Sequence, residues 1–457
     1  MNDTGRAIAY ASSLYLQRAN TAYAGYIQRD PMALLRLGPG RANPYPIYDR
    51  IRERGTLVPT RLGNWMSPSH RVCDSVLRNR RFGVRSAGTG TPAEPDEFDL
   101  SFLEMNPPDH TRLRRLALPA FSPKAVAGYQ DRITRTVGDL LDRACVAGEF
   151  DLVTGFAAPL PIAVITDLLG VPDADSSEFA RYGAVIATAL DGITSLRHAR
   201  RLQASDAALR RLFEKLFDLR RRVPRDDIIS RLVAAGPDQV RPDEILPMCV
   251  LLLIAGFETT VNLIGNAVLA LLDHPRQWQA LCADPAAMAA KAVEETLRYD
   301  PPVQVTSRVA LEPVDVDGKP VRMGQWVVTL IGAANRDPEA YDSPGTFDIN
   351  RVTTADHLAF SSGIHYCIGQ PLARLEATIA LRMLAERMPG LSRAGTIRRR
   401  NTTTIRGPAR LPVSTGARRR PTTPAPRPVP VAGGAARSLP ESGWTAGRPP
   451  DRQRQSR

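Results

Sequence analysis

The sequence lacks long apolar runs and closely spaced cysteines. Its longest continuous apolar stretch, Met248 to Phe257, is interior and about ten residues long, whereas a bilayer span needs about 20. The first 30 residues lack the apolar segment of a signal peptide. The five cysteines, at positions 73, 145, 249, 282 and 367, lie far apart, which indicates a reducing compartment. We therefore expect a cytoplasmic protein without a transmembrane anchor.

Aromatic residues are also scarce at the C-terminus. From Gly416 to Arg457 the chain has Trp444 as its one aromatic residue, eight Pro, and nine Arg against one Glu and one Asp, so +7 of the net charge of +13 lies there. Such a segment cannot bury enough apolar surface to fold. We predict an Arg/Pro-rich disordered tail over residues 416–457, with no nucleic-acid partner because basic and aromatic residues do not alternate.

A lone cysteine, Cys367, lies in a glycine-framed loop that runs from Phe360 to Gly369. One sulfur cannot complete a tetrahedral zinc site, which needs three or four protein ligands. A haem iron needs only one axial protein ligand, because the porphyrin supplies four nitrogens. The alternative is that the cysteine is a small apolar residue in a turn.

This loop resembles the haem-binding loop of the cytochrome P450 superfamily, in its soluble bacterial, actinobacterial-like form. The pattern Phe-x-x-Gly-x-His/Arg-x-Cys-x-Gly is met at Phe360, Gly363, His365, Cys367 and Gly369. The resemblance implies that the cofactor is haem b and that the sulfur is its metal ligand. It also implies that the glycines allow a close approach to the porphyrin, that backbone N–H groups point at the sulfur, and that the histidine reaches a propionate.

A second motif, Ala-Gly-Phe-Glu-Thr-Thr from position 255, lies in a stretch from Ile245 to Leu272 that is predicted to form a long buried helix. A glycine there weakens the local hydrogen-bond ladder, and a threonine can bond a carbonyl one turn back. The resemblance implies cofactor contacts for Ala255 and Gly256. It implies catalytic roles for Thr259, beside dioxygen and a relay water, and for Glu258, as the source of protons.

Glu295 and Arg298 are three residues apart on a helix predicted over residues 286–299, so they share a face. By resemblance this pair is buried and is joined by Arg351, supporting the cysteine loop structurally. Removing one member of such a network costs several kcal/mol.

A third motif begins at Pro107-Pro108, a helix start with prolines in its first turn. His110 and Arg114 lie four residues apart on one face. By resemblance they bind a haem propionate together with Arg308. For Arg112 and Arg115 we favour a solvated basic face.

The resemblance extends from about Asn43 to about Val413 and implies a mainly α fold with small β-sheets, a helical triangular prism around haem. We expect a partly helical N-terminal extension over residues 1–42 and the catalytic domain over residues 43–415. Residues 8–27, with Tyr10, Leu14, Tyr15, Tyr23 and Tyr26, predict an amphipathic helix. We favour packing of this helix on the body of the protein, with weak membrane contact as the alternative.

Periodicity predicts helices and strands along the body of the chain. The helices are predicted over residues 44–54, 71–79, 123–147, 159–169, 176–189 and 196–222, and the strands over residues 57–59, 64–66, 303–310, 314–316 and 326–331.

The implied function is a haem-thiolate monooxygenase that inserts one oxygen atom from O2 into a hydrophobic small molecule. No flavin or nicotinamide fingerprint is present, so electrons must come from a partner. We expect a ferredoxin with its reductase, docking where Arg112, Arg115 and Arg374 could gather, and a monomeric enzyme. The expected pocket walls consist mostly of apolar or small residues, which favours a hydrophobic substrate. These walls are residues 82–106, 176–201, 253–259, 303–305 and 402–405.

Three alternatives remain open at this point. A peroxide-dependent haem-thiolate peroxygenase usually replaces the acid–alcohol pair, which is retained here at Glu258 and Thr259. A non-catalytic haem sensor or carrier would need the thiolate but no proton relay. A helical interaction protein with a chance cysteine loop would bind no haem.

Overall fold

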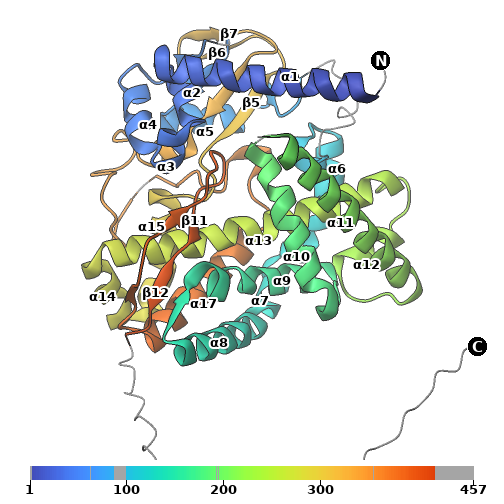
Figure 1. Cartoon of the computed structure of the whole chain (residues 1–457), viewed down its shortest axis with the longest axis vertical. Helices are drawn as coiled ribbons and strands as arrows, with labels where there is room; N and C mark the ends of the chain where they lie inside the picture. Colours follow the sequence, from blue (N-terminus) through green and yellow to red (C-terminus); the bar gives the residue numbers. More distant parts are fainter. Residues whose placement is uncertain are drawn as a thin grey trace, which may run out of the picture. The chain divides into compact units, whose positions relative to one another are not determined.

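The computed structural model describes residues 3–416, apart from residues 62, 87–98, 192, 194 and 354. Contacts divide the chain into residues 1–417 and 418–457. The second unit lies outside the described residues, so disorder of the tail stays a prediction. In the first unit helices dominate and strands are short (Figure 1), which confirms the mainly α class with small sheets.

The helices follow one another along most of the described chain. The α-helices are α1 Asp3–Ala22, α2 Pro31–Leu35, α3 Gly38–Ala42, α4 Tyr45–Arg52, α5 His70–Arg78, α6 Asp109–Ala117, α7 Pro123–Gly128, α8 Gln130–Ala147, α9 Pro159–Leu169, α10 Asp173–Ala187, α11 Leu196–Arg222, α12 Ile228–Ala234, α13 Pro242–Asp273, α14 Pro275–Ala283, α15 Pro285–Tyr299, α16 Ile331–Ala334 and α17 Gln370–Arg387. The shorter π and 3-10 turns are η1 Tyr23–Ile27, η2 Ser101–Glu104, η3 Leu118–Phe121, η4 Val153–Ala157, η5 Thr188–Asp191 and η6 Gly363–His365.

The central element of the core is α13, which crosses the middle of the molecule in Figure 1 and packs on α9, α15 and α17. It is long and apolar enough to cross a membrane, but 83% of its most apolar window is buried inside the protein. Gly256 allows close packing on α9, because a Cβ there would lie 2.5 Å from Ile165 Cδ1. We therefore regard α13 as a core helix.

The largest sheet has five strands in the order β1-β2-β8-β5-β3, with β2 and β8 parallel and the other pairs antiparallel. A three-stranded sheet, β4-β12-β9, ties the end of the described chain to its middle. The strands are β1 Val58–Pro59, β2 Trp65–Ser67, β3 Phe82–Gly83, β4 Glu149–Asp151, β5 Thr306–Ala310, β6 Val314–Val316, β7 Lys319–Val321, β8 Trp326–Thr329, β9 Ser392–Arg393, β10 Arg398–Arg399, β11 Pro408–Arg410 and β12 Pro412–Ser414.

The first 42 residues are helical over most of their length. Leu34 and Leu35 of α2 are buried in a cluster with residues of α4. The helix predicted over residues 8–27 is present as α1 and η1, and it packs on the body as favoured, with Leu14 buried and Gly25 against Leu37. Tyr15, Tyr23 and Tyr26 are exposed rather than packed on the body.

Candidate haem-thiolate site

The cysteine loop leads directly into a helix. Cys367 lies between the short turn η6 and the start of α17, and its N–H donates to Phe360 O at 2.9 Å. Gly363 has φ +70°, and a Cβ there would collide with Leu77 O at the end of α5. Glycine is required at this position because the loop turns in the left-handed region against α5.

Groups around Cys367 offset part of the cost of burying a thiolate. Burial raises the pKa of the Cys367 thiol, and four groups oppose that effect: the backbone N–H groups of Gly369 and Gln370 and the charges of Arg114 and Arg374. Amides and guanidinium groups directed at sulfur favour its anionic form, which is the form that binds a metal.

Two histidines lie against each other beside this loop. The ring centroids of His110 and His365 are 4.2 Å apart. Neither nitrogen of the buried His110 has a partner among the described residues, nor does Nε2 of His365. Burial and the neighbouring Arg114 and Arg308 lower the pKa of His110 to about 4.

The two arginines of this group also lack an acidic partner. In the described part of the chain no carboxylate lies within 4.0 Å of Arg114 or Arg308. Arg114 donates to Tyr366 O, and Arg308 donates to Ser307 O at 2.8 Å. Burial lowers the pKa of Arg308 to about 10.

These four basic side chains, with no carboxylate among them, form a site for an anion. We call His110, Arg114, Arg308 and His365 the basic cluster. Haem carries two propionates on one edge, so the basic cluster and the Cys367 loop together fit this group.

Glu258 and Thr259 of the distal motif have different surroundings. Thr259 Oγ1 donates to Ala255 O at 3.0 Å, and Ala255 is exposed although it lies mid-way along the otherwise buried α13. Glu258 is buried, and its Oε1 lies 2.5 Å from Nη1 of Arg400. Burial raises the pKa of the Glu258 carboxyl, while Arg400 opposes that shift.

The proximal network joins three charged side chains with several backbone groups. Arg298 binds Glu295 through two hydrogen bonds of 2.8 and 2.7 Å, and Arg351 Nε lies 3.3 Å from Glu295 Oε1. Arg298 also donates to Pro344 O and Thr346 O. The network therefore ties α15 to the chain that leads into the cysteine loop.

Comparison with known proteins identifies the family. A profile of the family "Cytochrome P450" matches residues 287–387. Cytochrome P450 monooxygenase PikC of Streptomyces venezuelae is 40% identical over 363 residues, covering 77% of this chain and 85% of that protein. The chain belongs to the cytochrome P450 family. A P450 is a haem-containing monooxygenase, so the resemblance, the fold and the enzyme class predicted from the cysteine loop are confirmed.

Solved structures agree with this assignment. The ligand-free CYP164A2 of Mycobacterium smegmatis superimposes on this P450 with a TM-score of 0.77, at 41% identity, covering 84% of this chain and 99% of that one. P450BioI, in complex with an acyl carrier protein that bears hexadec-9Z-enoic acid, gives a TM-score of 0.77 at 37% identity, covering 82% and 98%.

Two positions expected to gather as a free basic docking face are engaged elsewhere. Arg112 binds Glu244 at 2.7 Å and also Asp109, and Arg374 binds Glu294 at 2.6 Å. Both arginines are therefore ion-paired rather than free, and docking of an electron donor at this face stays a prediction. Arg115 is exposed.

Sequence reasoning missed two residues near the site, Arg400 and Gln370. Arg400 follows β10 in a run of three arginines, a pattern that is typical of an exposed basic surface. Only the structure shows that it lies beside Glu258. Gln370 contributes through its backbone N–H, which every residue type except proline carries, so no sequence signal could have found it.

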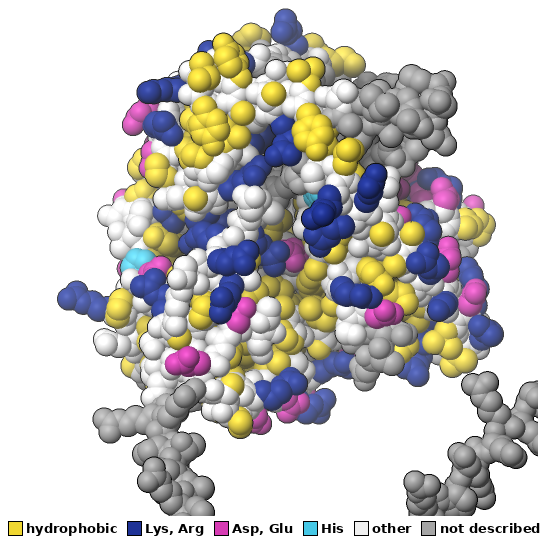
Figure 2. All heavy atoms as spheres, viewed as in Figure 1, with side chains coloured by type: hydrophobic (Ala, Val, Ile, Leu, Met, Phe, Trp, Pro, Cys, Tyr) yellow, Lys and Arg dark blue, Asp and Glu magenta, His cyan; other side chains and the backbone are white. Residues whose placement is uncertain are grey.

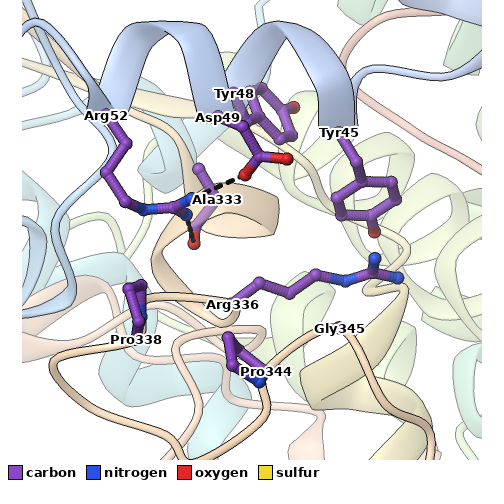
Figure 3. Close-up of a pocket in the computed structure, with 9 residues that line it drawn as sticks. All are labelled: Tyr45, Tyr48, Asp49, Arg52, Ala333, Arg336, Pro338, Pro344 and Gly345. Atoms are coloured by element: carbon purple, nitrogen blue, oxygen red, sulfur yellow. Dashed lines mark hydrogen bonds and ion pairs between the residues drawn. The ribbon is translucent and has the colours of Figure 1, made fainter.

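A separate cleft of about 250 Å³ lies between α4 and the chain after α16 (Figure 3). The Arg336 guanidinium lies 3.5 Å from the centre of the Tyr45 ring and 3.7 Å from that of Tyr299. Arg52 bridges Asp49 and Ala333 O. No lining residue is one of the predicted site residues, and these contacts hold α4 in place.

Proposed function

We propose that this P450 binds haem b, takes its electrons from a ferredoxin and a ferredoxin reductase, and oxidises a hydrophobic small molecule. The basic cluster is the observation that supports the cofactor proposal, because its uncompensated charge matches two propionates. A bound haem with a thiolate ligand would supply the chemistry that cleaves the O–O bond of dioxygen. A separate electron donor is proposed because the sequence has no flavin or nicotinamide fingerprint.

The chain's own residues hold and move the protons. Thr259 presents its hydroxyl beside the exposed Ala255, where it can hold a water. Glu258 is the group that can carry a proton from outside, but its Oε1 is held by Arg400. We propose that the carboxyl leaves Arg400 and rotates toward the Thr259 side to deliver the proton.

An apolar substrate is supported by the walls described around the distal helix. Val303 and Ile405, from two of the expected walls, are joined by a β-bridge, and Thr404 Oγ1 donates to Leu190 O at 3.3 Å. Residues 87–98 of the expected loop wall lie outside the described residues. P450BioI, in complex with an acyl carrier protein that bears hexadec-9Z-enoic acid, supports a substrate with a long apolar chain. A monomeric state and a cytoplasmic location stay predictions.

The decisive experiment is the spectrum of the reduced carbonyl complex of the wild type and of Cys367→Ser. Wild type should give the red-shifted Soret band of thiolate-ligated haem, and the variant should lose it or lose haem. An unchanged spectrum in the variant would refute Cys367 as the ligand.

Turnover then tests the electron source. Product should form with ferredoxin, reductase and nicotinamide, and hydrogen peroxide alone should support little of it. The reverse result would favour a peroxygenase.

In Thr259→Ala, haem and substrate binding should persist, while less product forms for each electron consumed.

A further inference from the structure

Exposed apolar side chains are concentrated in the N-terminal helix. Of the fourteen large hydrophobic side chains that are exposed in the described part, five lie between residues 15 and 27. They are Tyr15, Leu16, Tyr23, Tyr26 and Ile27, exposed by 51–68%, and we call them the tyrosine stripe. Figure 2 shows hydrophobic side chains gathered over α1, with Lys and Arg side chains among them.

The stripe lies on one side of a continuous helical segment. Because α1 runs directly into η1, the stripe residues at positions 15, 16 and 23 fall within an arc of about 100° at 3.6 residues per turn. The other side packs on the protein: Leu14 is buried, and a Cβ at Gly25 would collide with Leu37. The segment is therefore fixed to the body with its aromatic side outward.

After Asp3, which begins α1, the charge of this segment has one sign. Residues 4–29 include three arginines, at positions 6, 18 and 29, and no Asp or Glu. The next acid, Asp30, accepts the N–H of Ala33 at 2.9 Å and caps α2. An apolar surface with nearby cationic groups complements an anionic lipid bilayer, which has an apolar interior and negatively charged headgroups.

Tyrosine is the residue type that suits such a boundary. Its ring is apolar and its hydroxyl is polar, so it is enriched at the level of lipid headgroups. We propose that the tyrosine stripe lies on the surface of an anionic lipid bilayer and holds the protein there reversibly, with α1 in the plane of the interface. This proposal is independent of the substrate and of the electron donor.

Vesicle flotation of the full chain tests the proposal. The protein should float with vesicles of phosphatidylcholine and phosphatidylglycerol, and added salt or pure phosphatidylcholine should weaken the binding. The variant Tyr23→Ser/Tyr26→Ser/Ile27→Ser should bind about tenfold more weakly. A matched control, Val146→Ser/Met323→Ser/Val352→Ser, removes three exposed apolar side chains elsewhere (89%, 56% and 95% exposed) and should bind as wild type does.

Vesicle binding through the basic tail is the competing explanation, and the same variants distinguish it from binding through the tyrosine stripe. All of them retain residues 416–457, so binding through the tail would be equal in wild type and stripe variant, and that result would overturn the proposal. Absence of binding to either kind of vesicle would overturn it as well. Hydrogen exchange gives a second readout: vesicles should slow exchange in residues 12–29, and unchanged exchange there would contradict the proposal.

Discussion

Arg400 Nη1 lies 2.5 Å from Glu258 Oε1 and so joins the C-terminal hairpin to the distal helix of this P450. Glu258 is 5% exposed, and Arg400 is held in the hairpin by the hydrogen bond from its N–H to Gly407 O at 3.0 Å. The carboxyl proposed to supply protons is therefore paired with a cation from another part of the chain.

Loss of this cation should change the pH dependence of turnover. In Arg400→Gln the Glu258 carboxyl stays buried without its partner, so its pKa rises further and it stays protonated to higher pH. We expect the amount of product per electron to fall several-fold and its pH profile to move upward. Arg400→Lys should retain much of the wild-type profile. An identical profile in all three proteins would remove Arg400 from the relay.

Breaking the proximal network should destabilise the fold. Glu295→Gln leaves Arg298, which is 2% exposed, without its carboxylate, and a buried unpaired charge costs about 3–5 kcal/mol. Denaturant unfolding should show this loss together with lower haem content. The control Asp74→Asn breaks the exposed ion pair with Arg78 and should cost at most about 1 kcal/mol.

Gly363→Ala should impair the cysteine loop. The new methyl group would meet Leu77 O, and the backbone would keep φ +70°, at a cost of about 1–3 kcal/mol before any shift of α5. Lower thermal stability and haem content are the expected readouts. Gly345→Ala, where a Cβ meets nothing within 4 Å, should behave as wild type. Equal stability of the two variants would contradict the packing argument.

The basic cluster should govern how firmly haem is held. Arg308→Gln removes a buried cation that has no carboxylate partner among the described residues, so haem should transfer to apomyoglobin about tenfold faster, equivalent to about 1.4 kcal/mol. Arg81→Gln, at an exposed ion pair with Glu312, is the control. Equal transfer rates would exclude Arg308 from propionate binding.

The haem-free chain should lose stability in acid. In the folded state the pKa of His110 is about 4, below the value of about 6.5 for a solvated imidazole, so the unfolded chain binds more protons between these pH values. Stability should therefore fall as pH drops from about 6.5 to about 4, by on the order of 2–3 kcal/mol. Thermal unfolding of wild type and His110→Phe measures it, and the variant should show a smaller fall.

Local patterns in the sequence predicted several helices and the cysteine loop of this protein. The bounds of α9 and α11 coincide with those expected from periodicity, because the main signals for a helix lie within a few turns of the chain. The cysteine loop was recognisable for the same reason. Periodicity did not predict α17. The buried residues of this helix include the charged Glu376, so they do not form a purely apolar stripe in the sequence. The helix expected over residues 123–147 is divided at Tyr129 into α7 and α8.

The sequence alone determined the family, the thiolate loop and the pairing of Glu295 with Arg298, because each depends on residues within a few positions of one another. Only the tertiary structure decided that Arg400 pairs with Glu258, that the rings of His110 and His365 meet beside arginines with no carboxylate partner among the described residues, and that the N-terminal tyrosines are exposed. The energies of these arrangements depend on burial and on distances between residues far apart in the chain, for which no local pattern exists.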